Sequence, residues 1–132
     1  MKVLFVCSGN AHRSPLAEAL LKKLRPDLEV DSGGTHIAIP ISEKVREYLT
    51  KRNAEQYLKK VPEGLYTKQL DEYDLIVAME QRHKDYVLSR CPECKRKTAL
   101  WNIEDPYFMD KVDAEKIYEQ IRDKVIELAE SV

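Results

Sequence analysis

A cysteine and an arginine six positions apart mark the segment of this chain that is best suited to do chemistry. The segment reads Cys7-Ser8-Gly9-Asn10-Ala11-His12-Arg13-Ser14. A cysteine thiolate is a strong nucleophile, and a helix N-terminus or a nearby cation favours the thiolate form. The fork of an arginine side chain can hold two oxygens of a tetrahedral oxyanion at once. We therefore predict that Cys7 attacks an anion held by Arg13, with the Ser14 hydroxyl placed to donate a hydrogen bond to the thiolate.

The flanking residues indicate a strand before this segment and a helix after it. Lys2–Cys7 is a short apolar run typical of a buried strand, and Ser14-Pro15 predicts a helix start with a capping hydroxyl followed by proline. A loop between a strand and a helix points several backbone N–H groups into one hollow, where the helix end adds partial positive charge. We expect residues 8–14 to bind a phosphate-like anion in this way. Gly9 and Asn10 are expected to supply the left-handed conformations that a tight loop requires.

The rest of the chain alternates between apolar runs and helical patterns. Three further runs predict buried strands at Leu28–Ser32, Leu75–Met79 and Thr98–Ile103. Helices are predicted after Ser14-Pro15, after Ser42 as a possible cap, over His83–Arg90 and along the stripe from Ala114 to Leu128, with short turns and loops in residues 53–72.

This alternation predicts an α/β fold. We expect a single three-layer domain over residues 1–132, with a four-stranded parallel sheet, helices on both faces and the anion-binding loop between the first strand and the first helix. Right-handed crossovers bring the carboxyl ends of such strands to one edge of the sheet. The loops that follow Cys7, Ser32, Met79 and Ile103 should therefore meet.

Composition restricts the partners of the chain. It has 132 residues, of which 34% are charged, and a formal net charge of -1, so no general attraction to nucleic acid or to an anionic membrane is expected. No apolar run approaches the roughly 18 residues that span a bilayer. Three cysteines, an odd number, and the absence of an export signal indicate a reducing cytoplasm.

Four stretches of the sequence resemble the low-molecular-weight protein tyrosine phosphatases, in the order found in that family. They are VLFVCSGNAHRSPLAEALL at 3–21, DSGGT at 31–35, YDLIVAME at 73–80 and DPYF at 105–108. The resemblance implies the four-stranded parallel sheet, no metal or other cofactor, and hydrolysis of a phosphomonoester through a cysteinyl-phosphate at Cys7. The implied ligands are a phosphorylated protein or small phosphomonoester as substrate, and inorganic phosphate or vanadate.

The resemblance also implies roles for residues outside the loop. Asp105 matches the general acid of the family, which protonates the leaving group and, as a carboxylate, then activates water. Tyr107 and Phe108 match an aromatic wall beside the phosphate pocket. Asn10 and Ser32 would join the hydrogen bonds that hold the loop.

Three positions depart from the pattern of tyrosine-directed members. Ala11 stands where these members usually carry a bulky aliphatic residue and where relatives that act on phosphoarginine tend to carry threonine. Ala38 or a neighbour falls where the family often has an aromatic residue that stacks on the substrate. His12 replaces a second cysteine found in many members, and we expect it to face solvent. A protein tyrosine phosphatase is the leading hypothesis, and a protein arginine phosphatase is the alternative.

Two remaining cysteines, Cys91 and Cys94, leave other interpretations open. Arsenate reductases coupled to thioredoxin share this fold and loop, but their middle cysteine directly follows the third strand, where this chain has Met79-Glu80. A zinc site would need two more ligands than this cysteine pair supplies. A local disulfide or a pair of incidental thiols is the simpler interpretation.

A non-catalytic module that binds phosphoproteins is a further hypothesis, which the presence of both Cys7 and Asp105 disfavours.

Overall fold

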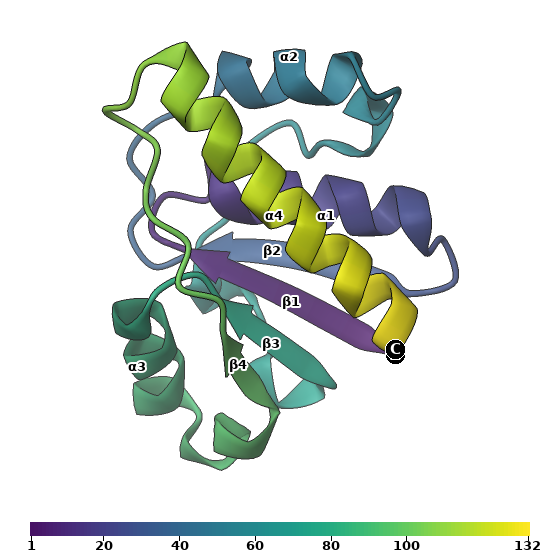
Figure 1. Cartoon of the computed structure of the whole chain (residues 1–132). Helices are drawn as coiled ribbons and strands as arrows, with labels where there is room; N and C mark the ends of the chain where they lie inside the picture. Colours follow the sequence, from purple (N-terminus) through teal and green to yellow (C-terminus); the bar gives the residue numbers. More distant parts are fainter.

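A computed structural model describes all of residues 1–132 and contains a four-stranded parallel sheet between two layers of helices (Figure 1). The strands are β1 (Lys2–Cys7), β2 (Glu29–Gly34), β3 (Leu75–Ala78) and β4 (Thr98–Leu100), in the order β2-β1-β3-β4. Every neighbouring pair runs parallel. The predicted α/β fold with a four-stranded parallel sheet is confirmed.

Four α-helices cover the two faces of the sheet. They are α1 (Arg13–Leu24), α2 (Glu43–Thr50), α3 (Gln81–Arg90) and α4 (Lys111–Ser131). Figure 1 shows α1 and α4 against one face, with α2 lying outside them, and α3 on the opposite side. The connections contain short 3-10 turns, namely η1 (Glu55–Tyr57), η2 (Leu65–Thr67), η3 (Leu70–Glu72) and η4 (Pro92–Lys97).

The central strand β1 contributes to two separate hydrophobic cores. Val3, Phe5 and Cys7 pack in the larger core, which lies under α1 and α4, whereas Leu4 and Val6 pack in the smaller core on the side of α3. This follows from the alternation of side chains along a strand. Because both faces of β1 are covered, it is apolar almost throughout, and it carries Cys7 to the buried end of the strand.

Several element boundaries differ from the prediction for local reasons. The last strand ends at Leu100 instead of Ile103, because Asn102 adopts a left-handed conformation with φ of 57° and breaks the extended chain. Helix α1 begins at Arg13, and the Ser14 hydroxyl makes no capping hydrogen bond because it is bonded elsewhere. Ser42 stands at the N-cap position of α2 but also makes no capping hydrogen bond. The short turns predicted for residues 53–72 are confirmed.

The fold brings the carboxyl ends of the strands to one edge, as Figure 1 shows for the arrowheads of β1 and β2. Loops from distant parts of the sequence therefore meet beside the end of β1. No helix of the chain combines the length and the apolar character that crossing a membrane requires.

Candidate active site

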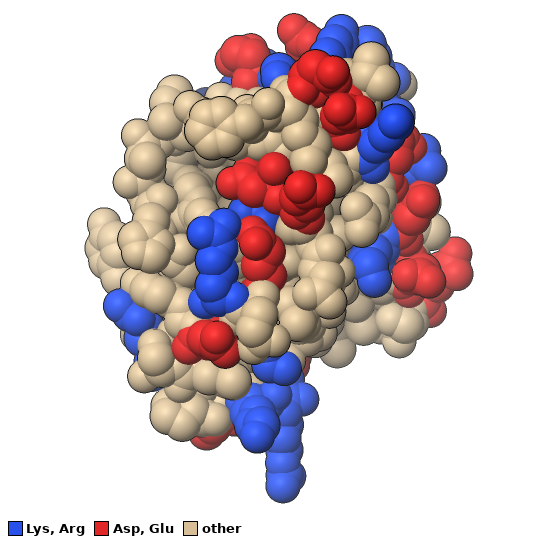
Figure 2. Space-filling model, turned by 60° about the vertical axis from the view of Figure 1, so that its left-hand side comes forward, with Lys and Arg blue, Asp and Glu red and all other residues tan.

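A hollow of about 260 Å³ lies at this edge of the sheet, with Cys7 among its lining residues. The lining comes from three segments: the loop after β1, the loop after β2 and the loop between β4 and α4. Its members are Cys7, Ser8, Gly9, Ala11, His12, Arg13, His36, Ala38, Ile39, Asp105 and Tyr107. Figure 2 turns this edge toward the reader and shows acidic and basic side chains close together near its middle, with uncharged surface beside them.

The backbone of residues 8–14 is open to a ligand. None of its N–H groups donates a hydrogen bond within the chain; the first helical bond of this region runs from the Leu16 N–H to the His12 carbonyl. These residues are buried or half-buried, where an unpaired N–H group carries a free-energy cost. A row of free amides at a helix N-terminus forms a site that attracts an anion.

The turn of the loop depends on Asn10 and not on Gly9. Asn10 has a φ of 51°, while no glycine in the chain has a positive φ. The expectation for Gly9 is wrong because a single left-handed residue suffices to turn the chain from β1 into α1. Asn10 tolerates this conformation better than most residues because its side chain forms local hydrogen bonds.

A glycine outside the loop is needed for its close packing. A Cβ atom placed on Gly34 would lie 2.5 Å from the Ser8 carbonyl oxygen and 2.9 Å from the Asn10 nitrogen. Both atoms are backbone, so neither can rotate away. The end of β2 can therefore pack against the loop only with glycine at position 34. The sequence shows a Gly33-Gly34 pair, but only the structure shows why glycine is needed there.

A chain of hydrogen bonds beneath the loop leads to the sulfur of Cys7. The Asn10 Oδ1 atom accepts hydrogen bonds from the Lys59 amine at 3.0 Å and from the Glu63 backbone N–H at 2.8 Å. Because both partners are donors, the Asn10 amide group must point its Nδ2 toward the Ser14 Oγ, which lies 2.8 Å away. The Ser14 hydroxyl accepts that bond, so its own hydrogen is free for the Cys7 Sγ at 2.9 Å. The Ser14 hydroxyl is therefore placed to donate a hydrogen bond to the sulfur.

The same network continues into the protein interior. The Asn10 Nδ2 atom also donates to the Ser32 Oγ at 2.9 Å, and the Ser32 hydroxyl donates to Glu18 at 2.5 Å. Glu18 is buried, with Lys22 and Lys59 within 4.0 Å as counter-charges. The sequence does not predict this role for Lys59, because a lysine in a polar stretch is usually exposed at the surface.

Arg13 is a buried cation held from behind. Its Nη1 atom donates to the Glu80 carboxylate and, at 2.8 Å, to the Ile103 carbonyl, whereas Nε and Nη2 make no hydrogen bond within the chain. The side chain is 2% exposed, and one edge of its guanidinium is anchored while the other makes no hydrogen bond. Although burial acts to raise it, hydrogen bonds from Arg13 and Arg82 hold the pKa of Glu80 below its usual range. The sequence analysis did not identify Glu80, although it lies two positions after the end of β3, at the edge of the sheet where ligands bind.

Asp105 lies beside Arg13 at the mouth of the hollow. Its Oδ2 atom is 3.7 Å from Arg13 Nη2, and its Oδ1 accepts a hydrogen bond from the Tyr107 backbone N–H at 3.0 Å. The second bond is a turn contact that orients the carboxylate. The Asp105 side chain is 44% exposed, so it can exchange protons with water as well as reach a bound substrate.

His83, on α3, is a further buried side chain that the sequence did not identify as part of the site. Its Nδ1 accepts a hydrogen bond from the Glu80 N–H at 3.1 Å, so the ring proton of the neutral imidazole is on Nε2, which lies 2.8 Å from the Ser8 Oγ. Burial lowers the pKa of His83 to about 4, and the Arg13 charge acts in the same direction. His83 thus ties α3 to the loop as an uncharged donor.

The rim of the hollow contains some, but not all, of the predicted pocket residues. Ala11, Ala38 and Tyr107 line it, whereas Phe108 does not and is 95% exposed. Phe108 packs its ring edge-on against Tyr107, with 4.7 Å between the ring centroids. His12 is half-buried and lines the hollow instead of facing solvent; burial lowers its pKa.

Cys91 and Cys94 form a disulfide in the smaller core, at the C-terminus of α3. This agrees with one of the two simple interpretations, a local disulfide. Cys7 is the free cysteine, and it packs in the other core.

A family model described as "Low molecular weight phosphotyrosine protein phosphatase" matches residues 2–132. The chain belongs to this family.

Relatives of this phosphatase family differ in the substrates that their names record. The low molecular weight protein-tyrosine-phosphatase Etp of Escherichia coli (strain K12) is 32% identical over 124 residues, covering 88% of this chain and 84% of Etp. A protein-arginine-phosphatase of Geobacillus stearothermophilus is 35% identical over 98 residues, covering 74% of this chain and 66% of the relative.

Solved structures of family members superpose closely on this chain. Vibrio vulnificus Wzb in complex with benzylphosphonate matches with a TM-score of 0.89 and 28% identity, over 99% of this chain and 98% of Wzb. The YwlE arginine phosphatase from Geobacillus stearothermophilus matches with a TM-score of 0.88 and 29% identity, over 98% of this chain and 91% of YwlE.

Proposed function

We propose that this family member is a protein tyrosine phosphatase that works through a cysteinyl-phosphate intermediate on Cys7. The observation that carries the proposal is the set of unpaired N–H groups in residues 8–14, a loop of which Ser8, Gly9, Ala11 and His12 line the same hollow as Cys7 and Arg13. These amides and the free edge of the guanidinium supply donors for the three non-bridging oxygens of a phosphate group. The complex of a similar protein, Wzb, with benzylphosphonate supports a ligand of this class.

In the first step, the Cys7 thiolate attacks phosphorus and forms an S–P bond while the P–O bond to the tyrosine breaks. Asp105, in its protonated form, gives its proton to the departing phenolate oxygen. Arg13 and the loop amides stabilise the negative charge on the equatorial oxygens, where it is spread in the transition state. Tyrosine leaves as the neutral phenol.

In the second step, water attacks the phosphocysteine. The Asp105 carboxylate takes a proton from this water as its oxygen bonds to phosphorus and the P–S bond breaks. Orthophosphate is released, Cys7 returns to the thiolate and Asp105 to the protonated form. The Ser14 hydroxyl, 2.9 Å from the sulfur, stabilises the thiolate as the leaving group of this step.

The proposal is tested by changing Cys7 to Ser. We expect turnover of p-nitrophenyl phosphate to disappear, while binding of vanadate, measured by calorimetry, persists. Rapid denaturation of the unaltered protein during turnover should trap one phosphate on the peptide that contains Cys7. Substantial hydrolysis by the Cys7→Ser protein would exclude covalent catalysis, and loss of vanadate binding together with turnover would indicate that the loop does not hold the anion.

A second substrate, phosphoarginine, has specific support. The related chains include named arginine phosphatases, and the small side chains of Ala11 and Ala38 line the hollow where larger residues would narrow it. Parallel measurements of kcat/KM on phosphotyrosine and phosphoarginine peptides of the same sequence distinguish the two. A preference for phosphoarginine would reassign the substrate and keep the chemistry.

The two remaining hypotheses receive less support. An arsenate reductase must pass oxidation between neighbouring thiols, but Cys91 and Cys94 pack in a different core from Cys7 and neither lines the hollow. A binding module would have no use for Asp105 beside the anion site. We place the enzyme in the cytoplasm, because a catalytic thiol stays reduced there; the Cys91–Cys94 disulfide is of a kind that is uncommon in that compartment and argues in the other direction.

A further inference from the structure

A groove of about 700 Å³ adjoins the hollow that contains Cys7. Three residues line both spaces, namely His12, Ile39 and Tyr107, so the two spaces are immediate neighbours. The remaining lining residues of the groove are Pro40, Ile41, Ser42, Glu43, Lys44 and Phe108. A molecule held over Cys7 that is larger than the hollow can therefore continue into the groove.

Part of the groove is formed by an apolar stretch of the loop between β2 and α2. The sequence of this stretch is Ile37-Ala38-Ile39-Pro40-Ile41, and its last three residues line the groove. Ile37 is 45% exposed, and Ala38 and Pro40 are exposed as well. Surface loops usually carry polar residues, and an exposed apolar run commonly marks a binding surface.

The aromatic part of the groove comes from the loop between β4 and α4. Phe108, which lies outside the hollow, lines the groove, and 95% of it is exposed. Its ring packs edge-on against Tyr107, which in turn lies edge-on to His12 with 6.0 Å between the ring centroids. Two loops thus expose apolar side chains to water beside one groove, and an apolar group bound there would cover them.

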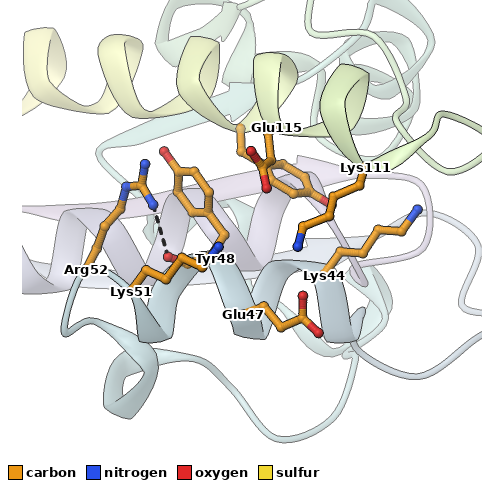
Figure 3. Close-up of a pocket in the computed structure, with 8 residues that line it drawn as sticks. Lys44, Glu47, Tyr48, Lys51, Arg52, Lys111 and Glu115 are labelled. Atoms are coloured by element: carbon orange, nitrogen blue, oxygen red, sulfur yellow. Dashed lines mark hydrogen bonds between the residues drawn. The ribbon is translucent and has the colours of Figure 1, made fainter.

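The charged residues of the groove do not favour a charged occupant. Glu43 and Lys44 have opposite charges and both have partners, because Glu43 accepts a hydrogen bond from Arg46 at 3.5 Å and Lys44 donates to the Met109 carbonyl at 3.2 Å. Lys44 also borders a smaller cavity between α2 and α4, where acidic and basic side chains are mixed (Figure 3). The groove, by contrast, is lined mainly by aliphatic and aromatic side chains.

We propose that this groove binds a large apolar side chain of the substrate protein, close in sequence to the phosphorylated residue. The inference rests on the proposed function and adds that the natural substrate is a polypeptide. An extended chain advances by at most about 3.6 Å per residue, so the apolar residue should lie within roughly three positions of the phosphorylated one. A small phosphomonoester would occupy the hollow and leave the groove empty.

A set of phosphopeptides tests this proposal. Each peptide carries one phosphotyrosine among serines, with a single leucine moved through the three positions on either side; phosphoarginine replaces phosphotyrosine if the enzyme prefers it. We expect the best placement to raise kcat/KM roughly tenfold over the all-serine peptide, as for burial of an apolar side chain. The gain should appear in KM and not in kcat, because contacts away from the phosphorus are equal in the ground state and the transition state.

A variant of Phe108 assigns the effect to the groove. Because the ring is almost fully exposed, the fold should not depend on it. In Phe108→Ala, the ratio of kcat/KM between the best leucine peptide and the all-serine peptide should decrease from about ten to about two. Tyr66→Ala is the matched control, since Tyr66 is an aromatic residue that is 84% exposed and lines neither the hollow nor the groove. Its ratio should equal that of the unaltered enzyme.

Turnover of p-nitrophenyl phosphate reports the chemistry separately, because this compound has no chain that reaches the groove. If it is not hydrolysed, the proposed function fails, and calorimetry with the same peptides still shows whether leucine strengthens binding. Absence of a leucine effect at every position, or an equal ratio in Phe108→Ala, would overturn the groove proposal. Association of two copies of the chain that Phe108→Ala abolishes, measured by analytical ultracentrifugation, would assign the groove to self-association instead.

Discussion

His83 and Ser8 are joined by a hydrogen bond of 2.8 Å although 75 positions separate them in the sequence. The imidazole is uncharged in this arrangement, because its other nitrogen, Nδ1, accepts a hydrogen bond from the Glu80 N–H and therefore carries no proton. The contact connects helix α3 to the loop that follows β1, and protonation of His83 would break the hydrogen bond from the Glu80 N–H that orients the ring.

The first prediction concerns stability in mild acid. As the pH falls from 6.5 toward 4, an unfolded chain takes up a proton on His83 that the folded chain does not, because the folded pKa is about 4. The unfolded state is therefore favoured, and the free energy of unfolding should decrease by about 1–2 kcal/mol between pH 7 and pH 5. Urea unfolding at these pH values should show a smaller decrease for His83→Gln. The exposed His36→Gln serves as the control; equal pH dependence of all three proteins would refute the assignment.

A second prediction tests the direction of the hydrogen bonds beneath the loop. Ser14→Ala removes the hydroxyl that donates a hydrogen bond to the sulfur of Cys7. We expect alkylation of Cys7 by iodoacetate to be slower by roughly tenfold, as for the loss of one hydrogen bond to a charged group. Ser8→Ala is the matched control, since the Ser8 hydroxyl is bonded to His83. An unchanged alkylation rate in Ser14→Ala would mean that the hydroxyl does not stabilise the thiolate.

The third prediction separates acid catalysis from anion binding. Asp105→Asn should decrease kcat on phosphotyrosine by roughly 100–1000-fold, because the phenolate must then leave without a proton. The decrease on p-nitrophenyl phosphate should be much smaller, since its leaving group is already stable as an anion. Glu104→Gln, at the neighbouring exposed position, should leave both rates close to those of the unaltered enzyme. Equal losses on the two substrates would remove Asp105 from the acid role.

A fourth prediction concerns the close approach at Gly34. Gly34→Ala would force a Cβ atom against two backbone atoms of the loop, so we expect a decrease in unfolding free energy of about 2 kcal/mol or more. Gly9→Ala is the control for stability, because the nearest atoms to a Cβ there are 3.9 Å away and the residue has no positive φ. Urea unfolding measures both. If Gly34→Ala were as stable as Gly9→Ala, the loop would have to be more adaptable than the structure indicates.

The sequence predicted the sheet and the anion-binding loop because both are local signals. A short apolar run followed by turn residues, such as Lys2–Cys7, favours a buried strand. Cys7 and Arg13 are six positions apart, so their proximity can be predicted without knowing the rest of the fold. Element ends were less predictable where a single residue decides them. Asn102, which ends β4 by its left-handed backbone, is an example.

The residues that support the loop could not be found in this way. Glu80, His83 and Lys59 contact it through side chains that come from separate elements. In the sequence, Lys59 is one more charge in a polar stretch and His83 one more polar residue at a helix start. Their partners become apparent only when the sheet places the end of β1 beside the end of β3, because hydrogen bonds between distant segments leave no periodic pattern.

The two sides of the loop that follows β1 make different contacts. On the side of the protein interior, hydrogen bonds join Asn10 to Ser14 and Ser32 and hold the shape of the loop. The other side lines the hollow together with the rim residues. Under the proposed function, we expect substitutions on the rim, at positions such as 38 or 107, to alter which phosphorylated side chain is accepted while the hydrogen bonds beneath the loop remain intact. Substrate choice and phosphate chemistry could then change independently of each other.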